Sequence, residues 1–159
     1  MKKSIKTEKI LEVYQVLRNA KFNKLDCEDQ INLVKIQLAL EPTAKAFEAD
    51  TKTASDKLKE AFPEFDKKLQ KANQYERMVN DPNAAAADLP MGAAEYHSFM
   101  NGEYVDFQKR VTAAVKDRSE KDVSVDFCPI SEEVLQKLIQ SNPAWTIGQA
   151  AILATITKK

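Results

Sequence analysis

The side chains that most often carry out chemistry, histidine and cysteine, are sparse in this chain. His97 is the single histidine, and the two cysteines, Cys27 and Cys128, lie far apart in the sequence and form no C-x-x-C pair. A metal or catalytic site needs several such groups at matched spacing. We therefore interpret His97 as a residue of a helix core or its edge. We interpret both cysteines as small buried side chains in a reducing compartment.

The sequence also lacks the motifs of common enzyme families. The segment HSFMNGEY around His97 contains no H-E-x-x-H, and neither G-x-x-x-x-G-K-[S/T], G-x-G-x-x-G nor G-x-S-x-G occurs. Pairs of Asp and Glu are frequent, but in a chain with 30% charged residues they are typical of solvated helix faces. We predict no catalytic residue, no metal ligand and no cofactor, and hence a protein that is not an enzyme.

The charge balance argues against a nucleic-acid partner. The chain has 24 Lys and Arg against 24 Asp and Glu, whereas a nucleic-acid binder usually carries a basic surplus. Residues 1–25 are locally basic, which fits a solvated helix face better than contact with an acidic partner. The two C-terminal helical segments could form a helix-turn-helix. The second segment, TIGQAAILATI, offers no Arg, Lys or Asn for base contacts.

The sequence predicts a soluble protein that is made in the cytoplasm and makes no membrane contact. No stretch approaches the roughly 18 apolar residues of a membrane span. The N-terminal MKKSIK has the charge of a signal peptide, but no apolar core follows it.

One segment has the alternation of a β-strand in a chain that is otherwise helical. In residues 122–130, DVSVDFCPI, the side chains of Val123, Val125 and Phe127 alternate with polar or small ones. A lone strand leaves its backbone donors and acceptors unpaired, and the only other candidate strand is the N-terminal KSIK. We therefore predict a two-stranded sheet of residues 2–6 with 122–128, whose exposed edge could accept a strand from another chain.

Helical periodicity covers most of the remaining chain. Thr7 and Asp26 are the predicted caps of the first two helices. Apolar residues then recur at spacings of three and four. The residues predicted to face inward from these two helices are Ile10, Val13, Tyr14, Leu17, Ile31, Val34 and Leu38.

Residues 43–121 are predicted to form a long antiparallel helical hairpin, or arm. Apolar residues at heptad spacing follow Pro42, DPNAAAADLP (81–90) is the tip loop, and a strong apolar stripe marks the return helix. The sequence leaves open whether the outgoing helix is continuous through Pro42 and Pro63. About 30 residues of helix reach roughly 45 Å, and an arm of that length is usually there to contact something.

The predicted fold is mainly α: a single domain, 1–159, with an arm on a small α+β base. The base consists of residues 1–40 and 122–159, and it includes the sheet and two C-terminal helices. Ser131 and Thr146 are the predicted caps of these helices. Trp145 is a predicted packing anchor between them, and the last helix is apolar enough to be buried in the chain or against a partner.

The order of these segments resembles a family of small late-gene proteins of unknown function from tailed phages and prophages. The segments that carry the resemblance are KSIKTEKILEVYQVL, QLALEPTAKAFEADTKTASDKL, VSVDFCPI and WTIGQAAILATI. Residues 63–103 depart from the family pattern and correspond to an insertion. The resemblance implies a role in the virion or in its assembly, and it provides no catalytic residues to transfer.

We therefore expect a non-enzymatic phage structural or assembly protein, such as a connector, tail or ring subunit. It would be a homo-oligomer with repeated contacts to itself and to other virion proteins, cytoplasmic when made and later part of the virion. The alternative is a monomeric assembly chaperone or host-factor inhibitor that captures one partner with its arm. The residues predicted to carry contacts or hold the base together are Val123, Val125, Phe127, Ile130, Trp145, Ile147 and Leu153.

Overall fold

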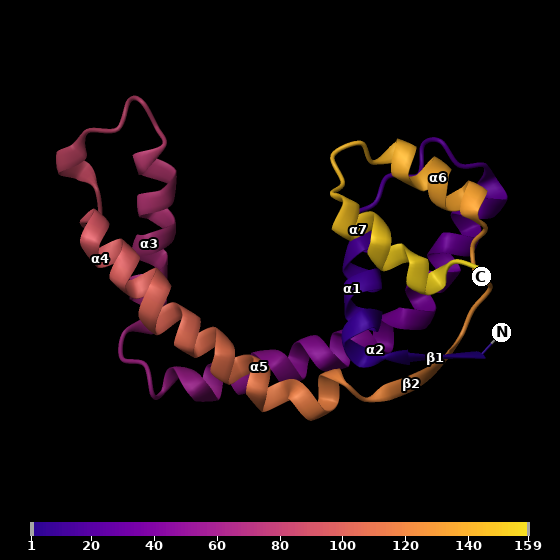
Figure 1. Ribbon diagram of the computed structural model, residues 1–159, viewed down its shortest axis with the longest axis horizontal. Helices are drawn as coiled ribbons and strands as arrows, with labels where there is room; N and C mark the ends of the chain where they lie inside the picture. Colours follow the sequence, from indigo (N-terminus) through magenta and orange to yellow (C-terminus); the bar gives the residue numbers. More distant parts are fainter. Residues whose placement is uncertain (1, 159) are drawn as a thin grey trace. The chain divides into compact units, whose positions relative to one another are not determined.

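The computed structural model describes residues 2–158, and these fall into two compact units (Figure 1). The first unit comprises Met1–Asp50 and Lys116–Lys159, and the second comprises Thr51–Val115. The predicted mainly α fold, with a long helix, a two-stranded sheet and C-terminal helices, is confirmed. The second unit is shorter at both ends than the predicted arm, 43–121.

Strands β1 (Lys2–Lys6) and β2 (Asp122–Asp126) pair antiparallel, with Lys2 opposite Asp126 and Lys6 opposite Asp122. This confirms the predicted pairing, although β2 ends at Asp126, two residues before the predicted end at 128. Thr7 was predicted to cap the first helix. Instead, both its backbone N–H and its hydroxyl donate to the Lys121 carbonyl, each at 2.9 Å, and so join the start of the helix to the start of β2.

The core of the first unit is formed by α1 (Thr7–Arg18), the N-terminal half of α2 (Cys27–Lys59), α6 (Glu132–Ser141), α7 (Ile147–Ile152) and the 3-10 turn η3 (Leu153–Ile156). Asn142, at the end of α6, holds the loop after α1. Its amide oxygen accepts from Lys21 N at 2.8 Å, and its amide nitrogen donates to Lys21 O at 2.9 Å. The largest fully buried side chains here are Ile10, Leu17, Leu33, Ile36, Leu40, Ile130, Leu138, Leu153 and Ile156.

Helix α2 buries a different face from the one predicted, and its course at Pro42 and Pro63, which the sequence left open, is now defined. The residues predicted to face inward, Ile31, Val34 and Leu38, are exposed, and the core instead receives Leu33, Ile36 and Leu40. Both sets have helical spacing, so periodicity alone does not distinguish them. The helix is continuous through Pro42, which lies between core-facing residues, and it ends before Pro63.

The last helix is less buried than its composition predicts. Thr146 and Gln149 form a capping box, in which Gln149 N donates to Thr146 Oγ1 at 3.3 Å and Thr146 N donates to Gln149 Oε1 at 2.9 Å. This cap starts α7 at the surface, so Ile147, the first helical residue, projects into solvent. Burial is complete only where the chain reaches η3, at Leu153 and Ile156.

The second unit contains a helical hairpin. Helix α3 (Phe65–Val79) packs against a return segment made of α4 (Ala93–Ser98), the π-helix η2 (Phe99–Tyr104) and the beginning of α5 (Val105–Ser119). Its connection, 80–92, includes the predicted tip loop and a short 3-10 turn, η1 (Ala86–Asp88).

Aromatic rings and one ion pair hold this hairpin together. The rings of Tyr75 and Tyr96 stack with centroids 4.7 Å apart. At the other end, the Phe65 ring lies 4.2 Å from that of Phe107. The Lys68 ammonium contacts Glu103 Oε2 at 2.8 Å, which adds a link between α3 and η2. The hairpin therefore has its own apolar cluster.

Candidate interaction site

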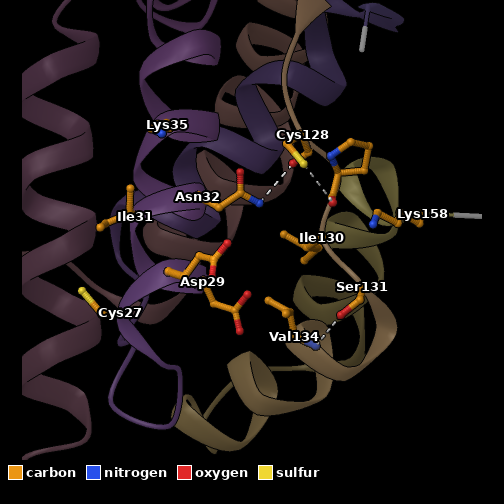
Figure 2. A pocket seen from close by; sticks show the side chains of 12 residues that line it. Cys27, Asp29, Ile31, Asn32, Lys35, Cys128, Ile130, Ser131, Val134 and Lys158 are labelled. Atoms are coloured by element: carbon orange, nitrogen blue, oxygen red, sulfur yellow. Dashed lines mark hydrogen bonds between the residues drawn. The ribbon is translucent and has the colours of Figure 1, made fainter.

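A groove opens in the first unit between the first turns of α2 and residues 128–134 (Figure 2). Its volume is about 620 Å³. One wall comes from α2, the other from the segment that leads from β2 into α6, and Lys158 closes one side. The lining residues are Cys27, Glu28, Asp29, Ile31, Asn32, Lys35, Cys128, Pro129, Ile130, Ser131, Val134 and Lys158.

Hydrogen bonds fix both walls of the groove. Asp26 caps α2 as predicted, since its carboxylate accepts from Asp29 N at 2.9 Å. Asn32 Nδ2 donates across the groove to the Cys128 carbonyl at 3.2 Å (Figure 2). Ser131 caps α6 as predicted and accepts from Val134 N at 3.2 Å. The side chains that line the groove are therefore presented from fixed backbone.

The second wall offers little backbone to an incoming strand. Pro129 has no N–H. Ile130 N donates to Ile156 O at 3.0 Å, and Ile130 O accepts from Lys158 N at 2.8 Å, so both of its backbone groups are paired. The Cys128 carbonyl already accepts from Asn32. A partner that enters the groove would therefore be bound through side chains rather than by extension of the sheet along 128–130.

The groove carries charges of both signs. Glu28 and Asp29 lie in the first turn of α2, where the helix dipole favours acidic groups. Partial burial raises the pKa of the Asp29 carboxyl, and the neighbouring Asp26 raises it further. Lys35 lies further along α2, and Figure 2 shows Lys158 on the opposite side from Asp29. This arrangement favours a partner that also presents both signs of charge.

Both cysteines line this groove, one on each wall, and both are exposed. The prediction that they are buried is wrong. Cys27 lies at the start of α2, on the face away from the core. Cys128 follows Phe127, which lies just beyond the end of β2 and is buried in the core of the first unit. Within residues 2–158, His, Cys, Asp and Glu form no group of three that could hold a metal ion.

His97 lies in the second unit and is exposed rather than part of a helix core. Its ring meets the edge of Tyr96, with centroids 5.3 Å apart. The Tyr96 hydroxyl donates to the Glu76 carboxylate, and this bond raises the pKa of Tyr96. The contacts of His97 show no catalytic partner among the described residues.

An apolar stripe on α2 continues from the groove along the helix surface. We define the outer stripe as Cys27, Ile31, Val34 and Leu38. Ile31 is 50% exposed, Val34 44% and Leu38 60%, and Cys27 is exposed as well. Cys27 and Ile31 also line the groove, so the stripe and the groove form one continuous surface. The sequence contains the signal for this stripe in the three-four spacing of Ile31, Val34 and Leu38, the residues that the sequence predicts to face inward.

The residues predicted to carry contacts lie elsewhere, for the most part in the core. Val125 and Phe127 are each 6% exposed, and Ile130 and Leu153 are also buried. Val123 and Trp145 are half-buried and pack against the core of the first unit. Ile147 is 91% exposed, so it does not hold the base together as predicted. Of the seven, only Ile130 lines the groove.

No helix in the described residues is both long and apolar enough to cross a membrane. Comparisons of the chain with protein-family models, with curated proteins and with solved structures find no match.

Proposed function

We propose that this chain is a non-enzymatic protein that acts by binding other protein subunits during assembly of a phage particle. The observation that carries the proposal is the exposed outer stripe of α2. Large apolar side chains that lie together on a surface commonly mark a contact with another protein. The groove beside the stripe adds charged side chains and a shaped boundary. The phage context rests on the four sequence segments that resemble the late-gene family.

Binding fits the groove better than catalysis does. Its hydrogen bonds tie side chains to backbone, as in the Asn32–Cys128 and Ser131–Val134 pairs. These bonds position the walls, and none of them pairs a nucleophile with a base, as a covalent catalyst requires. The subunit would be made in the cytoplasm and then enter the virion, with copies of itself and other virion proteins as partners.

A second candidate is a monomeric assembly chaperone or host-factor inhibitor that binds its partner through the hairpin of the second unit. The observation that favours it is a hollow of about 590 Å³ at the end of α3, lined by aromatic and charged residues. Val79, which is 51% exposed, is one of the residues that line it. A hollow lined by aromatic side chains can receive a side chain of a single partner.

Particle composition tests the proposed function. Phage particles would be purified from cells that carry the gene, and the chain would be quantified by mass spectrometry for the wild type and for Leu38→Glu. We expect the wild type in a constant ratio to the other particle proteins and a strong loss for Leu38→Glu. Ile147→Glu is the matched control, because it places the same charge at an exposed apolar position on α7.

The same experiment separates the candidates. A chain that is absent from particles but co-purifies in a one-to-one complex, which Val79→Glu disrupts, would support the chaperone or inhibitor. A chain that is absent from particles and forms no complex would refute both.

A further inference from the structure

The outer stripe of α2 has the geometry of a seam between two helices. Cys27, Ile31, Val34 and Leu38 follow one another at spacings of four, three and four, which is the pattern that packs one helix against another. At about 100° per residue, the stripe lies roughly 150° around the helix from the core-facing Leu33, Ile36 and Leu40. The stripe is therefore separate from the face that the first unit already covers.

Each flank of the seam is complementary to the same flank on a second copy of the helix. The flank toward the groove carries Glu28 and Lys35, which are opposite in charge and seven residues apart. Among residues 2–158, neither side chain forms an ion pair or a side-chain hydrogen bond within the chain. The other flank carries Gln30 and Gln37, at the same separation. The amide nitrogen of Gln30 donates to loop carbonyls, which leaves its oxygen to accept another bond.

We propose that the outer stripe binds α2 of a second copy of this chain, with the two helices antiparallel and related by a two-fold axis. In this register Ile31 faces Val34 of the second copy, and Cys27 faces Leu38. Glu28 then lies beside Lys35 of the second copy, and the two-fold axis repeats this ion pair. Gln30 comes beside Gln37 on the other flank. A surface whose positive and negative positions exchange under a two-fold axis is what a symmetric dimer requires.

The alternative orientation loses these ion pairs. In a parallel pair of helices, each groove-side flank faces the opposite flank of its neighbour. Lys35 would then lie beside Gln30 of the second copy, and Glu28 would face the segment before α2 begins. Charge therefore selects the antiparallel dimer over the parallel one.

The size of the seam sets the expected strength of the dimer. Residues 27–38 span about 18 Å of helix. Such a contact buries less than the roughly 800 Å² per partner of a standard stable interface. We therefore expect a dimer that dissociates at micromolar concentration. This inference rests on the proposed function and deepens it, because it names another copy of the chain as the first partner.

The test is the mass of the purified full chain by sedimentation equilibrium over a range of concentrations. We expect the wild type to rise from 17.9 kDa toward twice that value. Glu28→Lys and Lys35→Glu should each weaken the dimer about tenfold, because each substitution replaces two symmetry-related ion pairs by contacts between like charges. The double variant, Glu28→Lys with Lys35→Glu, should recover the wild-type constant, since each ion pair is re-formed with its charges exchanged.

Two further variants, each with an exposed apolar residue replaced by glutamate, and a check of folding complete the experiment. Leu38→Glu should abolish the dimer, whereas Ile147→Glu, equally a change at an exposed apolar residue, should leave it intact. Circular dichroism should show unchanged helicity for every variant, because the substituted side chains are exposed.

Several results would overturn the inference. These are a wild type that stays at 17.9 kDa at every concentration, a dimer that survives Leu38→Glu, and a double charge exchange that fails to restore dimerisation. Incorporation into particles separates this failure from failure of the proposed function. A monomeric wild type that still enters particles would refute the dimer alone.

Discussion

The three glycines of this chain allow one substitution, glycine to alanine, to be compared at three kinds of backbone position. Gly102 lies inside the π-helix η2, Gly148 in the first turn of α7, and Gly92 at the N-cap of α4. A Cβ added at Gly92 or Gly102 meets no heavy atom within 4 Å, and one at Gly148 lies 3.7 Å from Thr146 Oγ1, an ordinary contact. None of the three has a positive φ. Backbone conformation, rather than space, should therefore decide each result.

The expected change in the free energy of unfolding follows from the backbone entropy that a glycine loses on folding. Alanine loses less backbone entropy than glycine in a helix, so Gly102→Ala should stabilise the protein by about 1 kcal/mol. Gly148→Ala should stabilise it by less, because the full difference between glycine and alanine applies to helix interiors and Gly148 lies in the first turn of α7. Gly92→Ala should cost about 0.5 kcal/mol, because alanine is a poorer N-cap than glycine.

Differential scanning calorimetry measures these changes as shifts in Tm. If residues 2–158 unfold as one cooperative unit, Gly102→Ala should raise Tm by about 2–4 °C. If the unit Thr51–Val115 unfolds separately, the shift should be about 4–8 °C and confined to its own transition. Circular dichroism at 20–25 °C should show the same helicity for all three variants.

The order of the three Tm shifts tests the role of local backbone conformation. A lower Tm for Gly102→Ala would show that η2 holds a backbone that alanine does not tolerate, and the argument from open space and helix propensity would be wrong. Equal shifts for the three variants would refute the role of local conformation.

Three further substitutions test the packing. Phe65→Ala should lower the free energy of unfolding by about 3–5 kcal/mol in thermal unfolding, since Phe65 is 3% exposed and packs on Phe107. A loss below about 1 kcal/mol would contradict the central place of Phe65 in the apolar cluster. Asn142→Ala should lower the free energy of unfolding in urea by about 1–3 kcal/mol, because it leaves both backbone groups of Lys21 without their partner. An unchanged urea midpoint would show that water replaces these hydrogen bonds. Pro42→Ala should raise the urea midpoint, because proline in a helix interior costs up to about 3 kcal/mol relative to alanine, and a lower midpoint would mean that packing depends on the ring.

The pairing of β1 with β2 could be predicted because the alternatives were few. Val123 and Val125 mark one strand by their alternation, and the segment around Ile5 was the only other candidate in a helical chain. Backbone groups need partners, so two candidates imply one pairing. The caps Asp26 and Ser131 were also predictable, because capping is a local interaction between a side chain and a backbone group a few residues away.

The surface of α2 could not be predicted in the same way. Ile31, Val34 and Leu38 have the spacing of a buried face, and so do Leu33, Ile36 and Leu40. Helical periodicity describes faces of a single helix and contains no information about where its neighbours pack. The assignment of the first set to the core was therefore wrong, and a candidate contact surface was missed.

The sequence by itself determined which segments are helices, which two segments pair as strands, and where several of the helices begin, because these depend on spacing and on contacts between near neighbours. Only the tertiary structure decided which side of α2 faces solvent, that Cys27 and Cys128 line one groove, and that Ile147 is exposed. These features arise where α1, α6 and η3 fill one side of α2 and leave the other side open. Burial depends on which elements pack together in space. Elements that pack together can lie a hundred residues apart in the sequence, so local patterns do not specify their contacts.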